Sequence, residues 1–152
     1  MPLRYVVPDT CAIAASLYNE MHSSVTDPML QSIRLRTVDA VAPTSGLSEF
    51  LNISRRKLDL NAVNPLSHSA VDSAVAEFMS LPITWVDIEP YAEEAWRLHR
   101  VHKIETGDAF FVTIAMEFSA EIWTVDNQFT ATTKIMYENI YDLKVVPWRD
   151  RY

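Results

Sequence analysis

Short apolar runs alternate along the chain with longer segments in which apolar residues recur every three or four positions. Runs of the first kind predict strands, and the second spacing predicts amphipathic helices. The expected strands span residues 4–8, 38–43, 83–88, 121–125 and 144–146. The expected helices span residues 10–20, 28–40, 47–58, 68–79, 90–102 and 108–118. This alternation predicts parallel βαβ units and a three-layer α/β sandwich around a mostly parallel sheet.

The fourth predicted helix shows both a start signal and an apolar stripe. Ser67 is a good N-cap residue, because its hydroxyl can accept a hydrogen bond from a backbone N–H of the first turn. Val71, Val75, Phe78 and Met79 follow at helical spacing. We expect these four side chains to form the buried face of the helix.

We expect the four tryptophans to be core or interface residues rather than platforms on which nucleic-acid bases stack. They are Trp85, Trp96, Trp123 and Trp148. The last five residues, 148–152, are mostly polar. We expect this segment to be either a frayed tail or a dimer contact.

Composition narrows the class of protein. A chain of 152 residues with 49% apolar and 22% charged residues predicts one soluble domain over residues 1–152. Cys11 is the only cysteine, so no intrachain disulfide can form. Pro8 and Asp9 interrupt the N-terminal apolar run, and no run approaches the roughly 18 apolar residues of a membrane span. We therefore expect a cytoplasmic protein with no membrane partner.

The formal net charge of −7 argues against a general nucleic-acid binder, because such proteins usually present a basic surface. Basic residues do gather locally, at 34 and 36, at 55–57, and at 97, 100 and 103. Solvated helix faces are the simpler explanation of each patch. The charge therefore weakens the case for a nucleic-acid substrate without excluding it.

Four carboxylates stand where strands end or helices begin. Asp9 ends the first predicted strand, Asp126 follows the fourth, and Glu49 and Asp108 lie near two helix starts. In an open α/β sheet these positions line one crevice. Two carboxylates about 4 Å apart repel by roughly 4 kcal/mol at an effective dielectric of about 20. Four of them together predict a site for a divalent cation.

The donor set limits the chemistry. Hard cations such as Mg²⁺ take carboxylate oxygens and water, and they support phosphodiester hydrolysis without a covalent nucleophile. Gly46 and Gly107 are the only glycines, so G-x-G-x-x-G and P-loop motifs are absent. Each glycine precedes a candidate acid. Glycine at these two positions could allow the backbone to approach a ligand closely, but ordinary flexibility at a helix entry is the favoured explanation.

The chain resembles the PIN-domain family between about residues 4 and 130. The resemblance rests on Val6-Val7-Pro8-Asp9-Thr10, Ala42-Pro43, Glu49-Phe50-Leu51-Asn52, Ile104 to Phe111 and Ile122 to Phe129, in that order. It implies a Rossmann-like sandwich that cleaves RNA with one or two Mg²⁺ or Mn²⁺ ions. Many small members are VapC-type toxins, so it also implies an antitoxin partner and a homodimer.

The resemblance implies a role for each matching residue. Asp9, Glu49, Asp108 and Asp126 would be the catalytic metal ligands, with Asp126 less directly bound. Thr124 would orient an acid or a metal water.

Two other positions would lie beside these ligands. Asn52, one turn after Glu49, would support the ligand set. Cys11 departs from the Ser or Asn found in many members two residues after the first Asp. Its acidic surroundings predict a raised thiol pKa, so we expect a small packing residue and not a nucleophile.

Other interpretations remain at this point. Each acid alone has an ordinary explanation: Asp108 could complement a helix dipole, Asp126 could sit in a turn, and Glu49 could be solvated. A haloacid-dehalogenase-type phosphatase is disfavoured, because its second nucleophile-motif Asp is replaced here by Cys11. An inactive PIN-like module that binds protein stays open as the second hypothesis.

Overall fold

The computed structural model describes residues 4–152, so residues 1–3 of the predicted domain lie outside the described residues. Five strands form one sheet in the order β3-β2-β1-β4-β5, and every neighbouring pair is parallel. The strands are β1 Tyr5–Pro8, β2 Asp39–Pro43, β3 Ile83–Val86, β4 Glu121–Thr124 and β5 Ile140–Asp142. The predicted parallel sheet is confirmed.

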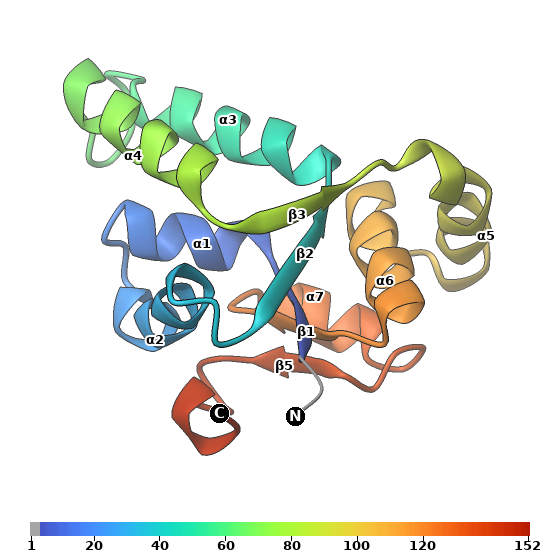
Figure 1. Ribbon diagram of the computed structural model, residues 1–152. Coiled ribbons are helices and arrows are strands. Elements are labelled where there is room, and N and C mark those ends of the chain that lie inside the picture. Colours follow the sequence, from blue (N-terminus) through green and yellow to red (C-terminus); the bar gives the residue numbers. More distant parts are fainter. Residues whose placement is uncertain (1–3) are drawn as a thin grey trace.

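Helices cover both faces of this sheet (Figure 1). One apolar core holds residues of α1 Thr10–Leu17, α2 Ser23–Arg34, α3 Ser45–Lys57 and α4 His68–Ser80. The second core holds residues of α5 Ala92–His102, α6 Thr106–Phe118 and α7 Asn127–Thr133. Two short 3₁₀ turns, η1 Glu89–Tyr91 and η2 Trp148–Asp150, complete the order of elements. The three-layer α/β sandwich is therefore confirmed.

The strand order places β1 at the centre of the sheet. The chain leaves β1 for β2 on one side, continues outward to β3, and then returns to β4 on the other side of β1. The helices that follow β1 and β2 lie on one face, and those that follow β3 and β4 lie on the other. The carboxyl end of β1 is thus the point where the winding reverses, which is where open α/β sheets leave a crevice.

Aromatic packing holds the helices of the first face together. Phe50 of α3 and Phe78 of α4 are both buried, and their rings stack with centroids 3.8 Å apart. Tyr18 stacks on the other side of Phe50 at 5.8 Å. This packing fixes α3, and with it the side chains that α3 carries toward the end of β1.

Two predicted element boundaries were wrong. The second helix spans Ser23–Arg34 and not 28–40, although Met29, Leu30 and Ile33 form its buried face. Its first turns are polar, and there buried Thr26 bonds Ser16 at 2.6 Å, a contact that apolar spacing does not reveal.

The last strand also lies elsewhere. It spans Ile140–Asp142 and not 144–146, since the backbone N–H groups of Val145 and Val146 bond the Asp142 carbonyl and form a turn. The short helix α7 was not predicted from the sequence.

One predicted burial position was also wrong. Met79 is 59% exposed, and Ala74 takes its place beside Val71 and Phe78 on the buried face of α4. Of the tryptophans predicted for the core or an interface, Trp123 is fully buried and Trp96 is 59% exposed. The Ser67 cap is confirmed, because its hydroxyl accepts the Ala70 N–H at 3.1 Å.

The C-terminal segment is packed and not frayed. Trp148 is buried, its ring lies 4.8 Å from that of Trp123, and its indole N–H donates to Ser32 Oγ at 2.8 Å. Arg151 Nε donates to Glu121 at 2.6 Å. Among residues 4–152, no helix is long and apolar enough to cross a membrane.

The stacked aromatic pair predicts a large stability difference between two adjacent positions of α4. Phe78→Ala should lower the free energy of unfolding by about 3–5 kcal/mol, because it leaves a cavity against Phe50. Met79→Ala, the matched control at an exposed position, should change it by less than about 0.5 kcal/mol. Urea denaturation of both variants measures the difference. Similar losses in the two variants would contradict the assigned face of α4.

Candidate active site

All four predicted carboxylates line one cavity at the carboxyl edge of the sheet. The cavity has a volume of about 710 Å³ and is lined by Asp9, Glu49, Asp108 and Asp126, with Asn52 beside them. Asp9 follows β1 and Asp126 follows β4, while Glu49 lies in α3 and Asp108 in α6. Residues separated by up to 117 positions in the chain therefore meet at the place where the winding of the sheet reverses.

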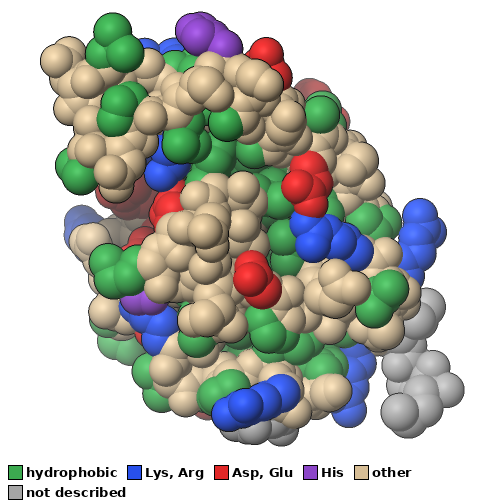
Figure 2. All heavy atoms as spheres, turned by 90° about the vertical axis from the view of Figure 1, so that its left-hand side faces the viewer, with side chains coloured by type: hydrophobic (Ala, Val, Ile, Leu, Met, Phe, Trp, Pro, Cys, Tyr) green, Lys and Arg blue, Asp and Glu red, His purple; other side chains and the backbone are tan. Residues whose placement is uncertain are grey.

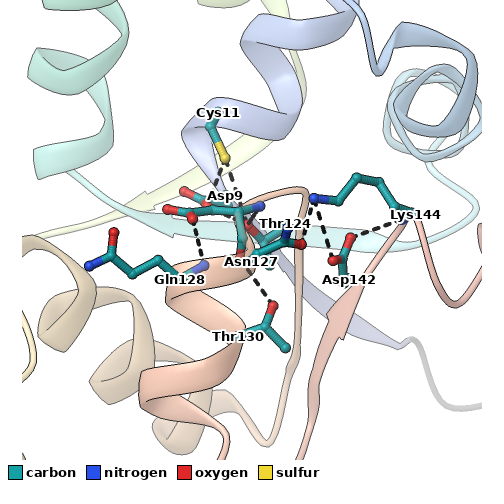
Figure 3. Close-up of polar contacts among 9 residues, drawn as sticks. Asp9, Cys11, Thr124, Asn127, Gln128, Thr130, Asp142 and Lys144 are labelled. Carbon is teal, nitrogen blue, oxygen red and sulfur yellow. Dashed lines mark hydrogen bonds and ion pairs between the residues drawn. The ribbon is translucent and has the colours of Figure 1, made fainter.

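Thr124 joins the ends of the two central strands. Its side chain is fully buried, and its hydroxyl donates to Asp9 Oδ2 at 2.7 Å (Figure 3). The same oxygen of Thr124 accepts the backbone N–H of Asp126 at 2.9 Å. One hydroxyl thus fixes the rotamer of Asp9 and the path of the chain into Asp126.

Cys11 makes a second contact to Asp9. The thiol donates to Asp9 Oδ2 at 2.9 Å, so Cys11 and Thr124 both bond one oxygen of the carboxylate and leave Oδ1 for another partner. Burial, and then the nearby charge of Asp9, raise the pKa of the Cys11 thiol far above its usual range. The predicted rise is confirmed. A thiol held in its protonated form is a hydrogen-bond donor here and not a nucleophile.

Asp126 has a local structural role as well. It is the N-cap of α7, where Oδ1 accepts the Gln128 N–H at 2.9 Å, and its side chain is exposed. The residues that follow are held by their own contacts, since Lys144 Nζ donates to Asn127 at 2.6 Å and lies 3.6 Å from Asp142. One carboxylate oxygen of Asp126 is therefore engaged outside the cavity, at the start of α7.

Glu49 reaches across the cavity to the start of α6. A Cβ atom on Gly107 would lie 3.0 Å from Glu49 Oε1, closer than side chains normally pack. Neither Gly107 nor Gly46 has a positive φ, so the flexibility favoured from the sequence is not the reason for either glycine. At Gly46 the limit is the Trp85 ring, 3.2 Å from the position of a Cβ. A side chain at position 107 would therefore require the Glu49 carboxylate to shift by a few tenths of an ångström.

Burial and mutual repulsion raise the pKa values of three of the acids. Burial raises the pKa of Asp108 to about 7, and the charges of Asp9, Glu105, Asp126 and Glu49 add to the effect. Burial is also the main cause of the raised pKa of Glu49, partly offset by a hydrogen bond from Thr10.

The pKa of Asp9 is likewise raised by burial, although hydrogen bonds from Cys11 and Thr124 oppose the shift. A cation bound between these groups would replace repulsion by attraction.

Sequence reasoning missed three charged residues of the cavity. Glu105, the N-cap position of α6, adds a fifth carboxylate, and Arg55 and Arg56 of α3 supply cations at its edge. A signal for Glu105 was present, since it lies three residues before Asp108 at a helix start. The arginines gave only a charge pattern, because their positions relative to the acids depend on how α3 packs.

The donor set fits a hard divalent cation. Every candidate ligand is a carboxylate, and Mg²⁺ is typically bound by one or two carboxylates with several waters retained. Among residues 4–152, no three His, Cys, Asp or Glu side chains converge closely enough to chelate an ion directly. The arrangement therefore suits an ion bound by few direct ligands, with the remaining acids reached through water.

Three solved structures share this architecture. VapC20 from Mycobacterium tuberculosis, described as a sarcin-ricin loop cleaving toxin, aligns with a TM-score of 0.65 and 17% identity over 83% of this chain and 93% of its own. PAE2754 from Pyrobaculum aerophilum aligns with a TM-score of 0.65 and 18% identity, covering 96% and 93% of the two chains. This is a VapC-like PIN-domain fold.

A toxin–antitoxin complex from Klebsiella pneumoniae shares the PIN-domain fold with a TM-score of 0.60 and 13% identity, covering 91% of this chain and 97% of that one. No family model and no curated protein matches the sequence. The resemblance drawn from the sequence is thereby confirmed at the level of the PIN-domain fold.

The raised pKa values should make the metal-free protein less stable as the pH rises. The folded state holds the Asp108 proton up to about pH 7, whereas an ordinary Asp has a pKa of 3.8, so the free energy of unfolding should fall across this interval. At about 1.4 kcal/mol per pH unit, discounted for solvent screening at a half-buried carboxyl, the fall due to Asp108 is roughly 2 kcal/mol. Urea denaturation in EDTA at several pH values measures it.

Asp108→Asn should flatten this dependence, and Asp72→Asn, at an exposed position of α4, should keep the slope of the parent protein. A parent stability that rises between pH 5 and pH 7 in EDTA would show that the acids do not repel one another.

Proposed function

We propose that this protein is a ribonuclease, a hydrolase that cleaves RNA phosphodiester bonds with one or two Mg²⁺ or Mn²⁺ ions. The observation that carries the proposal is the cavity at the end of β1, where burial and then mutual repulsion raise the pKa values of Asp9, Glu49 and Asp108, and where none of the three forms an ion pair with a described residue. Such an arrangement costs stability, and a cation-dependent activity gives a reason for it.

The acids divide into direct and indirect ligands in this proposal. Asp9 Oδ1 and Asp108 would bind the ion directly, and Glu49 and Asp126, which already caps α7, would act through water. When bound, the ion polarises the scissile phosphate and lowers the pKa of the attacking water. Thr124 and Cys11 hold Asp9 in place, so this carboxylate does not have to be ordered when the ion arrives.

The proton balance follows from the same contacts. Asp108, with a pKa of about 7, is partly protonated in the free protein at neutral pH and loses its proton when a cation binds. The only cysteine is kept protonated beside Asp9, so its thiol does not act as a covalent nucleophile. Water is therefore the nucleophile in this proposal.

RNA is the substrate class that the comparisons favour. VapC20, which shares the fold, is described as a toxin that cleaves the sarcin-ricin loop. Arg55 and Arg56 at the cavity edge supply local positive charge for a phosphate backbone in a chain whose net charge is −7. The positive charge of these two arginines at the cavity offsets the argument that the net negative charge makes against RNA binding.

The proposal extends to partners and location. The Klebsiella pneumoniae neighbour was solved as a toxin–antitoxin complex, which supports an antitoxin partner for this chain. Apolar side chains that such a partner could cover are exposed on α4 and in the loop before it, at Leu60, Val63 and Met79. We further propose a homodimer in the cytoplasm, where a lone thiol remains reduced.

An inactive PIN-like module that binds protein is the alternative. It is favoured by the fifth carboxylate, Glu105, which makes the cavity still more acidic and less attractive to RNA without metal. Cys11 no longer supports it, because the thiol supplies the hydrogen bond to Asp9 that a hydroxyl would supply. Cleavage measurements separate the two functions.

Asp108→Asn tests the nuclease proposal. In Mn²⁺ or Mg²⁺, the parent protein should cleave members of a mixed RNA panel, and EDTA should stop cleavage. Loss of a direct metal ligand should lower the rate by roughly 10²-fold or more. Without metal, the variant should melt at the same or a higher temperature than the parent, because one repulsive charge is gone.

Asp72→Asn is the matched control and should cut as the parent does. A metal-independent activity, or an Asp108→Asn variant as active as the parent, would contradict the assigned site. Absence of cleavage by the parent, with no rise in melting temperature on adding Mn²⁺, would favour the binding module.

A further inference from the structure

A second cavity continues from the acidic one along α3. It has a volume of about 440 Å³, and it shares Cys11, Ile53 and Arg56 with the cavity that holds the carboxylates. We call it the flanking pocket; its lining residues are Cys11, Ala14, Glu20, Ile53, Arg56, Lys57, Ala62, Val63 and Asn64. The face toward α1 to α4 is hollowed at one side, where acidic and basic side chains meet below a projecting part (Figure 2). The two cavities therefore form one groove.

One face of α3 runs along this groove. Glu49, Ile53 and Arg56 are spaced i, i+4 and i+7, so they lie on the same side of the helix. Seven residues at 1.5 Å each place Arg56 about 10 Å beyond Glu49 along the helix axis. The helix thus carries a carboxylate at the acidic end of the groove and a guanidinium at the junction with the flanking pocket.

Arg56 is available for a ligand. Among residues 4–152, no carboxylate forms an ion pair with Arg55 or Arg56, whereas Lys57 beside them is paired with Glu20 at 2.7 Å. Basic residues in the last turn of a helix are favoured by its dipole. The helix dipole does not explain why Arg56 lies at the junction of the two cavities, where it could bind a phosphate group.

The flanking pocket has the size and lining for a nucleobase. Ala14, Ile53 and Ala62 give it an apolar wall, and Asn64 adds a side-chain amide that can bond the edge of a base. Its outer wall is the loop after α3, which is tied down where the Leu66 N–H bonds the Lys57 carbonyl at 2.8 Å. The Asn61 N–H also bonds Asp59 Oδ1 at 2.9 Å. The wall is therefore formed before a ligand binds.

We propose that the flanking pocket holds an unstacked nucleotide next to the cleavage site and that Arg56 binds its phosphate. This inference rests on the proposed ribonuclease function and narrows its substrate to single-stranded RNA or an open loop. Bases in a stem are paired and stacked, so they cannot enter a side pocket, whereas bases in loops can be splayed out and read. Arg56 is a substrate-binding residue in this account and Asn64 is a specificity residue.

The test measures binding apart from cleavage. All variants are made in the Asp108→Asn background, and binding of a fluorescent single-stranded RNA is followed by polarisation in Mn²⁺ over a range of salt concentrations. Loss of one phosphate contact in Arg56→Gln should reduce the slope of log Kd against log salt by about 0.7. Arg56→Lys should keep most of the slope.

Arg100→Gln is the matched control, because it makes the same charge change at an exposed site of α5 outside both cavities. It should leave the slope unchanged. Ala62→Phe, which fills the flanking pocket, should weaken binding and leave the slope unchanged. The two groove variants therefore separate the phosphate contact from the base pocket.

Cleavage supplies the second readout. With Asp108 intact, Arg56→Gln should raise KM by about 10-fold with little change in kcat, as expected when a contact that binds substrate and transition state equally is lost. An RNA hairpin should be cut in its loop and not in its stem.

The outcomes separate this inference from the proposed function. Cleavage by the parent, with equal salt slopes for Arg56→Gln and Arg100→Gln, would overturn the flanking pocket and leave the ribonuclease standing. Binding that depends on Arg56, without cleavage by the parent, would support the groove and overturn the enzyme. Cleavage within stems, or a groove that binds an apolar peptide and no RNA, would overturn the inference.

Discussion

The position of β1 in the sheet is the constraint on which the rest of the structure depends. Because the chain winds outward on one side of β1 and returns on the other, the helices after β1 and after β3 lie on opposite faces. A crevice must open where they part, at the carboxyl end of β1. Asp9 stands at that point, and α3 and α6 bring Glu49 and Asp108 to it from the two faces. The backbone topology, not local sequence, creates the site.

Contacts with neutral groups hold the carboxylates in place although they repel one another. Thr124 is fully buried and bonds Asp9, and the Glu49 carboxylate lies against Gly107, which has no side chain. Cys11 adds a thiol donor at 2.9 Å. Neutral donors can hold a carboxylate without neutralising it, so the cavity keeps its negative charge. The site is thus ordered without a cation, and the proposed cation would relieve the repulsion between its carboxylates.

Much of this arrangement could be predicted from the sequence, for physical reasons. Apolar runs ending in an acid mark Asp9 and Asp126 at strand ends, and the Ser67 cap marks the start of α4. Strand alternation with helices then predicts the parallel sheet. The resemblance to PIN domains supplied the role of Thr124, which the structure places against Asp9.

Other features depend on tertiary contacts that no local pattern encodes. The polar start of α2 is stabilised by the bond between Thr26 and Ser16, and β5 is a three-residue strand followed by a turn. The side chain that lies closest to Gly107 is 58 positions away in the sequence.

The most direct test of the cation site is a calorimetric titration with Mn²⁺ at pH 6.5 in two buffers of different ionisation enthalpy. Binding should release protons, since Asp108 has a pKa of about 7 in the metal-free protein, and the release should vanish at pH 8.5 and in Asp108→Asn. Mn²⁺ binding without proton release at pH 6.5, or no binding at all, would contradict this account.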